Sequence, residues 1–408
     1  MTSDATRPLW RGRTLALIGV VLVAANLRTA VASLSPIVGQ IGADIPLSPV
    51  LVGLVGTAPP VCFALFGVVT PMLARRLGLE RLLVLALLTL AVGLVLRALA
   101  PAFALLFAGT VLAFAGIAAG NVLLPPLIKK YFPDRIGLLT TTYITVMSIT
   151  AALPPLIAVP VADAAGWRVS LGMWGAYAVI AVIPWLALLV RARSSPAESG
   201  LDAPDPAVVG TLWRSRIAWS LAVLFTVSSL TAYTMFAWLP TFLVEIAGVK
   251  AADAGGLVAV FIIVSLPPAI VVPLVAARAR SITPFLVVGI VPTLAGYAGL
   301  LLAPAAAPVL WVALVGAAQL FFPLALVLIN LRTRSHEASV ALSGFVQSVG
   351  YAIAALSPVV VGVLVQTTDG WTASLTLLAV VALAAIPAGV VVARPRTIEE
   401  ETAIKRAA

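Results

Sequence analysis

The chain has very few charged or reactive side chains for its length. Its 408 residues include one cysteine, one histidine and fifteen acidic residues, and only 10% of all residues are charged. Soluble domains carry about 25% charged residues, so this composition excludes an ordinary soluble protein. The single cysteine, Cys62, excludes a disulfide within the chain.

The acidic residues are also missing from the middle of every long apolar stretch. All fifteen lie in predicted loops, at the termini or at the ends of the stretches, and His336 lies in a predicted loop. An intramembrane enzyme needs a nucleophile with its base, or metal ligands, within reach of one another. We therefore expect no catalytic residue, no metal and no cofactor, and we set aside a membrane enzyme or a non-transporting sensor.

Long apolar stretches are what the sequence has in abundance. The chain is 62% hydrophobic, and its mean hydropathy is +1.14. A bilayer is crossed by roughly 20 apolar residues, and the segment must be helical because lipid offers no partner to a free backbone group. The sequence predicts an all-α membrane protein with twelve transmembrane helices, at about 14–37, 50–73, 81–99, 102–127, 137–160, 168–190, 216–246, 254–276, 283–303, 307–330, 338–364 and 371–393.

The first stretch has some features of a cleaved signal peptide. Arg7, Arg11 and Arg13 resemble a basic leader, and Ala30-Val31-Ala32 resembles a cleavage site. The apolar stretch continues past that site, however, and it has a counterpart in the second half of the chain. We therefore interpret it as a retained transmembrane segment.

The basic residues are unevenly divided between the two sides that twelve crossings define. With the N-terminus inside, 21 of the 25 Lys and Arg residues fall in inside segments, whereas Arg97, Arg168 and Lys250 fall outside. This asymmetry follows the positive-inside rule and predicts that both termini are cytoplasmic, with the protein in the cytoplasmic (inner) membrane. The net charge of +10 is thus a topology signal, and no nucleic-acid partner is expected.

The chain repeats itself at an offset of about half its length, which indicates two similar halves. The matching segments are 71–76 with 273–278, 151–155 with 354–358, 166–171 with 370–375, and Pro36 and Ile41 with Pro240 and Ile246. We predict an N-terminal six-helix half at 1–190, a cytoplasmic linker at 191–212, a C-terminal six-helix half at 213–396 and a cytoplasmic tail at 397–408. The linker is polar and rich in proline, and the tail is expected to be a solvated, dispensable segment.

Several local motifs occur in the same order as in a known transporter family. They are Asn26-Leu27-Arg28, the stretch Gly116 to Pro133, Trp238-Leu239-Pro240, and the stretch Phe322 to Tyr351 with its Leu342-Ser343-Gly344. Together they resemble the cyanate permease family of the major facilitator superfamily, whose members include cyanate and 2-nitroimidazole transporters. The resemblance implies two pseudo-symmetric six-helix bundles around a central site that faces each side of the membrane in turn.

The resemblance also implies a gating role for the cytoplasmic loop after the second span and its counterpart. The residues concerned are Arg75, Arg76, Gly78, Glu80, Arg81 and Arg278. The wider superfamily usually carries an aspartate before an Arg-x-Gly run, where it latches onto a neighbouring helix end. Here Arg75 occupies that position, so either Glu80 takes over the latch or the latch differs.

Arg28 is the only ionised side chain that we expect near the middle of the membrane. Intramembrane ionisable groups are functional by default, although Arg28 could instead bond the carbonyls of a kinked neighbour or extend toward the surface. Without an acidic partner, a cation is disfavoured as substrate and an anion is favoured, since a guanidinium presents a planar fork of donors. In one continuous helix Asn26 would point about 200° away from Arg28, so we assign Arg28 to the ligand and Asn26 to support. Arg97 is expected to extend to the outer surface.

Other candidate substrate-binding residues are polar or aromatic side chains at the depth of a central cavity. They are Tyr233, Gln347, Asn121, Tyr143, Trp238 and Gln319. For each, a role in packing one helix against another is the alternative.

Two transport functions stay open on the sequence. The first is secondary active transport of a small anionic or polar solute of the cyanate, nitrate or carboxylate kind, by alternating access. The second is efflux of nitroimidazole-like or other drug molecules. We expect a small-molecule substrate and the lipid bilayer as partners, coupling to protons or to a counter-substrate, and a monomer. A proton relay through carboxylates or histidines is not expected, because none lies within a span.

Overall fold

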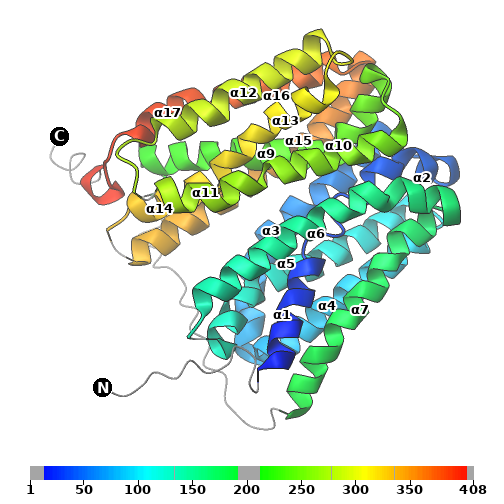
Figure 1. The fold of residues 1–408 in the computed structure, drawn as a ribbon, viewed down its shortest axis with the longest axis horizontal. Coiled ribbons are helices and arrows are strands. Elements are labelled where there is room, and N and C mark those ends of the chain that lie inside the picture. Colours follow the sequence, from blue (N-terminus) through cyan, green and yellow to red (C-terminus); the bar gives the residue numbers. More distant parts are fainter. Residues whose placement is uncertain (1–12, 133, 192–211, 277, 335, 402–408) are drawn as a thin grey trace.

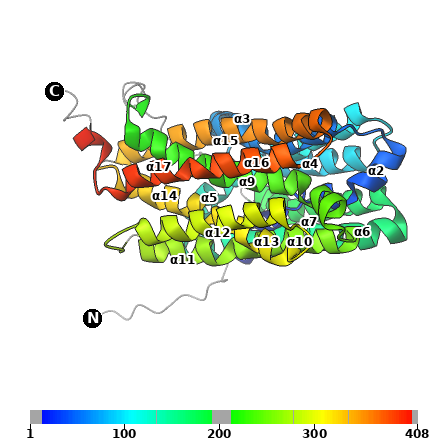
Figure 2. The same cartoon turned by 90° about the horizontal axis from the view of Figure 1, so that it is seen from above.

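The structure is a computed structural model that describes residues 13–132, 134–191, 212–276, 278–334 and 336–401. The described residues form helices with turns between them and contain no strand, which confirms the all-α prediction. Among them, eleven helices or pairs of consecutive helices are long and apolar enough to cross a membrane. The helices run roughly alongside one another in two groups (Figures 1 and 2).

The N-terminal half contains the helices coloured blue to green in Figure 1. Their bounds are α1 Thr14–Asn26, η1 Ser35–Ile37, α2 Val38–Asp44, α3 Pro49–Leu77, α4 Leu79–Ala98, α5 Phe103–Tyr131, α6 Ile136–Ala165 and α7 Trp167–Arg191.

The C-terminal half contains the helices coloured green to red. Their bounds are α9 Arg216–Ala247, α10 Ala251–Val264, α11 Leu266–Ala276, α12 Thr283–Leu302, α13 Pro308–Gly316, η2 Ala317–Leu320, α14 Phe321–Leu331, α15 His336–Thr368, α16 Thr372–Leu383 and α17 Ala385–Ala393. The predicted eighth, tenth and twelfth spans are therefore each built from consecutive shorter helices. The predicted linker lies almost wholly in 192–211, outside the described residues.

The first membrane segment is broken, so the prediction of one helix over about 14–37 is wrong. α1 ends at Asn26, and the chain passes through turns and bends at 27–34 before η1 and α2. Polar side chains compete for the backbone here: Thr29 Oγ1 donates to the Asn26 carbonyl at 3.0 Å and Ser33 Oγ to the Ala30 carbonyl at 3.3 Å. Pro36 brings no N–H to continue a helix. The break is tolerated because most of this segment is buried in protein rather than exposed to lipid.

Equivalent contacts in the two halves support the internal repeat. The Trp167 indole donates to the Asp44 carboxylate at 3.0 Å, and the Trp371 indole donates to the Glu245 carboxylate at 2.7 Å. Each pair joins the start of a half's last segment to the end of its first. Hydrogen bonds from Arg168 and from Trp167 hold the pKa of Asp44 below its usual value. A hydrogen bond from a tryptophan indole to a carboxylate thus occurs in both halves, about 200 residues apart in the sequence.

The two halves meet closely where α3 begins, at the end opposite the start of α1. A Cβ atom on Gly53 would lie 2.5 Å from the Pro358 carbonyl oxygen, and one on Gly255 would lie 2.2 Å from the Pro155 carbonyl oxygen. Thr57 Oγ1 donates across the interface to the Ala355 carbonyl at 2.8 Å. Only glycine allows backbones this close. We call this end, around Gly53 and Gly255, the closed end.

Part of the predicted solvated tail is docked on the C-terminal half, so that expectation is wrong for 397–401. Ile398 is buried and donates its N–H to the Arg332 carbonyl at 2.9 Å. The Glu401 carboxylate accepts from the Ser215 hydroxyl at 2.6 Å and from the Arg216 N–H at 2.8 Å. A carboxylate at a helix N-terminus compensates free N–H groups and the helix dipole. Glu401 therefore caps α9.

Shortening the chain after Arg396 should lower its stability. The loss of the carboxylate at the start of α9 should cost about 1–2 kcal/mol, as for other N-terminal caps. The melting temperature of the purified protein in detergent should fall by roughly 2–6 °C. A chain ending after Glu401 is the matched control and should melt as the full chain does. Equal melting of both truncations would contradict the capping role.

Candidate functional site

Arg28 lies in the broken part of the first segment, between α1 and η1. Its side chain is half-buried, and its guanidinium carbon lies 5.6 Å from the centre of the Phe63 ring on α3. The guanidinium lies close enough for its charge to act on the hydroxyl groups of Tyr233 on α9, Tyr143 on α6 and Tyr351 on α15. Because Arg28 lies beyond the end of α1, it does not share one helix with Asn26, contrary to the prediction.

Aromatic side chains from both halves lie near this guanidinium. The ring centres of Phe63 and Tyr233 are 6.4 Å apart, those of Phe63 and Tyr351 are 6.2 Å apart, and those of Tyr233 and Tyr351 are 6.3 Å apart. Phe63 belongs to the N-terminal half, whereas the two tyrosines belong to α9 and α15 of the other half. One positive charge and nearby phenol groups thus lie at the boundary between the halves. We call these four side chains, Arg28 included, the Arg28 cluster.

Asn26 does not bond Arg28 in the described contacts. It is the last residue of α1, is fully buried, and donates from Nδ2 to the Leu22 carbonyl of its own helix at 2.9 Å. Its Oδ1 has no hydrogen-bond partner. The structure therefore places Asn26 at the end of the helix, directly before the break that carries Arg28.

Of the other predicted candidates, two bond within their own helix. Asn121 Nδ2 donates to the Ile117 carbonyl at 3.0 Å, and Gln347 Nε2 donates to the Ser343 hydroxyl at 2.8 Å. Both are half-buried, so each has part of its surface free.

Two further candidates, Trp238 and Gln319, connect elements of the C-terminal half. The Trp238 indole donates to the Pro358 carbonyl at 2.9 Å and thereby ties α9 to α15. Gln319 Nε2 donates to the Ser228 carbonyl at 3.2 Å and ties η2 to α9. These contacts indicate packing roles for Trp238 and Gln319, because they use the polar atoms that a ligand would need.

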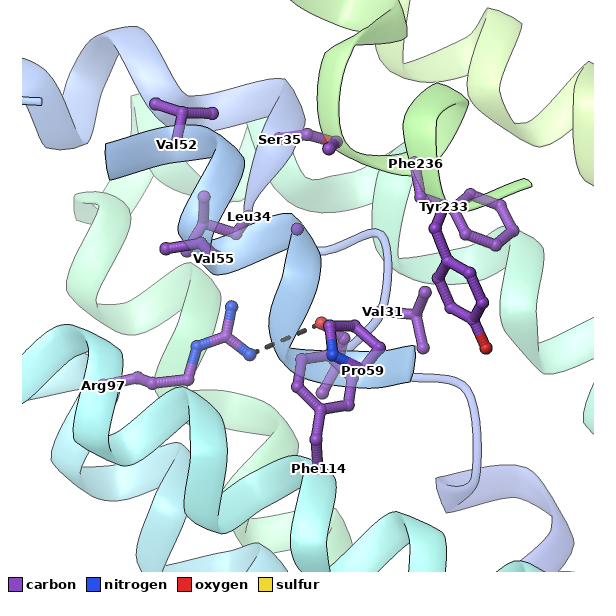
Figure 3. A pocket seen from close by; sticks show the side chains of 13 residues that line it. Val31, Leu34, Ser35, Val52, Val55, Pro59, Arg97, Phe114, Tyr233 and Phe236 are labelled. Carbon is purple, nitrogen blue, oxygen red and sulfur yellow. Dashed lines mark hydrogen bonds between the residues drawn. The ribbon is translucent and has the colours of Figure 1, made fainter. Parts of the chain in front are cut away.

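Arg97 is buried, so the prediction that it extends to the outer surface is wrong. Its side chain is 1% exposed, and Nη1 donates to the Ala30 carbonyl at 3.4 Å (Figure 3). This carbonyl belongs to the broken segment, two residues after Arg28. The span therefore ends with an arginine that reaches inward between α4 and the first segment. Arg97 is consequently more deeply buried than Arg28, which is half-buried.

The predicted gating loop joins α3 to α4 through Gly78, whose φ of 82° is unfavourable for other residues. Glu80, in the first turn of α4, is buried and accepts from Lys130 Nζ and from the Tyr131 hydroxyl, at 2.9 Å for the latter. Both partners end α5 of the same half. In this state Glu80 is thus held within its own half.

The basic residues of this loop differ from Glu80 in their surroundings. Arg76, Arg81 and Arg278 are exposed, and the Arg75 side chain lies outside the described part of the structure. Their part in gating stays a prediction.

Sequence reasoning missed Phe63 and underrated Tyr351 and Arg97. Phe63 is one apolar residue among many, and nothing in its own span distinguishes it. Tyr351 lies one helical turn after Gln347, on the stripe that the sequence already indicated. Arg97 bonds the Ala30 carbonyl, which belongs to the same broken stretch as Arg28.

Comparison with known proteins agrees with this architecture. Residues 16–354 match the model of the Major Facilitator Superfamily. The uncharacterized transporter YycB of Bacillus subtilis (strain 168) is 32% identical over 266 residues, which is 63% of this chain and 63% of YycB. The 2-nitroimidazole transporter of Escherichia coli (strain K12) is 31% identical over 64% of this chain and 65% of its own.

The cyanate transport protein CynX of Escherichia coli (strain K12) is also similar. It is 30% identical over 59% of this chain and 62% of its own. The chain thus covers a little under two thirds of the length of each of these three relatives. Their names confirm the predicted resemblance to cyanate and 2-nitroimidazole transporters.

Solved structures share the fold over nearly the whole chain. A bacterial homologue of the human lysosomal transporter Spinster, in an inward-facing and occupied conformation, has a TM-score of 0.72 at 15% identity, over 93% of this chain and 96% of its own. A D-xylose–proton symporter has a TM-score of 0.69 at 13% identity, over 94% of this chain and 99% of its own. At these identities the likeness concerns the fold alone. With the family model matching most of its length, this chain belongs to the Major Facilitator Superfamily.

Proposed function

We propose that the protein is a secondary active transporter of a small planar anion of the cyanate, nitrate or carboxylate kind. The Arg28 cluster is the observation that carries this proposal. It places a guanidinium in a break of the first segment, beside aromatic residues of both halves. Discontinuous membrane helices and a site between the two halves are typical of transporters.

The chemistry of the cluster favours an anion with two acceptor atoms. A guanidinium binds carboxylate-like groups through two parallel hydrogen bonds, and the Tyr233 hydroxyl can donate a further one. We propose that Arg28, Tyr233 and Tyr143 contact the substrate, with Phe63 and Tyr351 closing the sides. Asn121 and Gln347 line the path of the substrate, and Asn26, Trp238 and Gln319 hold the surrounding elements.

The close packing of one end of the interface supports transport by alternating access. At the closed end the halves touch through backbone atoms around Gly53 and Gly255. Because the ligand contacts come from both halves, rocking one half against the other would open the closed end and rearrange the cluster. We propose that the protein works as a monomer in the bilayer, coupled to protons or to a counter-substrate.

Uptake into liposomes tests the proposal. The full-length protein, reconstituted in liposomes, should take up radiolabelled formate with saturation, and cyanate and nitrate should compete. Protein-free liposomes are the control for leakage. The absence of saturable uptake of these anions, together with saturable uptake of 2-nitroimidazole, would overturn the anion proposal in favour of the second candidate.

The second candidate is export of a nitroimidazole-like molecule. The rings of Phe63, Tyr233 and Tyr351 lie at mutual distances that suit a flat heteroaromatic ligand, and one relative is named as a 2-nitroimidazole transporter. A neutral ring should depend on these side chains more than on Arg28. Its binding should therefore persist when Arg28 is replaced by glutamine, whereas anion binding should not.

We further propose that the start of α1 and the end of α17 face the cytoplasm, as the distribution of basic residues indicates. In a Cys62→Ala background, single cysteines at the exposed positions Ser281 and Ala306 should label from opposite sides of the membrane. An impermeant maleimide added to whole cells should react at position 306 only. Reaction at position 281 without reaction at 306 would invert the orientation, and equal reaction at both would contradict it.

A further inference from the structure

A cavity near the closed end of the interface is lined in part by the broken segment that also carries Arg28. It has a volume of about 20 Å³ and is lined by residues of both halves, among them Ser35, Val55, Pro59, Arg97, Phe114 and Tyr233 (Figure 3). Tyr233 borders the cavity and is also one of the tyrosines on which the charge of Arg28 acts. Gly56 lines the cavity as well, and a Cβ there would lie 2.7 Å from the Ala237 side chain of the other half. The cavity thus borders a close contact between the two halves.

Two polar groups of the cavity wall are buried without a full set of partners. Arg97 Nε has no hydrogen-bond partner, and the contact from Nη1 to the Ala30 carbonyl, at 3.4 Å, is long for a hydrogen bond. The Ser35 hydroxyl is 5% exposed and also has no partner. A buried charge is costly unless it is paired and hydrogen-bonded, so a guanidinium in this setting favours an anion.

We propose that Arg97 and Ser35 form a second anion site, separate from the Arg28 cluster. This inference rests on the proposed function and extends it to a second station on the substrate path. The ligand is a small planar anion with at least two acceptor atoms, such as a carboxylate or nitrate. Arg97 supplies the charge and Ser35 donates a hydrogen bond. Tyr233 is near Arg28 and also borders the cavity that contains Arg97. In this proposal an anion released by Arg28 therefore moves to Arg97 first, and the closed end opens afterwards.

A contact between the corresponding elements of the C-terminal half shows that they can pack together without a charge. There, Tyr297 on α12 lies 3.3 Å, oxygen to oxygen, from the Thr231 hydroxyl on α9. At the offset of 204 residues that relates Pro36 to Pro240, α12 is the counterpart of α4, and Thr231 lies three residues before Thr234, the counterpart of Ala30. A neutral phenol thus joins the same two elements in that half. Packing α4 against the first segment therefore does not by itself require the positive charge of Arg97.

Counting bound anions tests the second site. The probe is radiolabelled formate, measured by equilibrium dialysis on the full-length protein in detergent, with nitrate as competitor. The wild type should bind two formate ions per chain, and Arg97→Gln should bind one. Ser35→Val keeps the charge but fills the cavity, so it should also bind one. Tyr297→Phe is the matched control in the other half and should still bind two.

The outcomes separate the two proposals. Arg28→Gln should also bind one formate. One formate in the wild type, lost only in Arg28→Gln, would overturn the second site and leave the proposed function standing. Two in Arg28→Gln and one in Arg97→Gln would support the second site and contradict the role of Arg28. If Arg97→Gln does not fold, Ser35→Val decides, and two ions bound with wild-type affinity in that variant would overturn the site.

Discussion

Replacing Arg28 with alanine should abolish anion transport while leaving the protein folded in the membrane. The described contacts of this side chain are to the Phe63 ring and to tyrosine side chains, and no backbone carbonyl is among them. Its removal therefore strands no buried acceptor. A bound anion, by contrast, would lose its charged hydrogen bonds, which together are worth about 3 kcal/mol or roughly 100-fold in affinity.

The conservative variant separates charge from geometry. Arg28→Lys keeps the charge but loses the planar fork, so affinity should fall by about tenfold while some transport remains. The measurement is stabilisation by formate in thermal melts, followed by uptake into liposomes. Lys250→Ala, at an exposed position, is the control and should behave as the wild type does. If Arg28→Ala expresses poorly or melts much earlier without any ligand, the arginine has an architectural role instead.

A side chain at Gly53 should push the closed end open. The added Cβ would lie 2.5 Å from the Pro358 carbonyl oxygen and 2.8 Å from the Val359 Cα, so one of the two halves must move. Overpacking of this kind costs about 1–3 kcal/mol. A penalty that falls on one state only shifts the balance between the two states by roughly 5- to 150-fold. Gly53→Val should therefore favour the state that is open at this end and slow transport.

Gly67 on the same helix provides a matched control. A Cβ there meets nothing within 4 Å, so Gly67→Val should leave the balance unchanged. Spin labels at Ala43 and Lys250, both exposed and in different halves near the closed end, should report a longer distance in Gly53→Val. Unchanged distances and transport in Gly53→Val, or equal effects of the two variants, would show that the contact does not gate access.

The transmembrane helices and the internal repeat were predictable from the sequence. Helices were expected because a bilayer leaves no alternative for the backbone, and the repeat was visible in short matching segments. The contacts of Trp167 with Asp44 and of Trp371 with Glu245 agree with that repeat. Arg28 was a candidate because an arginine in an apolar stretch is costly, and such a signal can be read without coordinates.

Contacts between distant segments were not predictable in the same way. Whether the first segment stays helical after Asn26 depends on what can satisfy the freed carbonyls, and Arg97 comes from a span about 70 residues later. The docking of 397–401 depends on Glu401 finding the start of α9, which local polarity does not reveal. The local sequence indicates that a polar group without a partner would be costly in the membrane. Which residue becomes the partner of that group depends on how the helices pack.

By itself, the sequence determined the class of protein, its helical spans, its two similar halves and the sign of the charge in its central region. These properties follow from transfer of apolar segments into lipid and from the cost of burying charge, and both depend on composition along the chain. Only the tertiary structure decided that the first segment is broken, that Phe63, Tyr233 and Tyr351 surround Arg28, and that Arg97 turns inward. These features depend on packing between residues far apart in the chain, where backbone groups and charges find their partners.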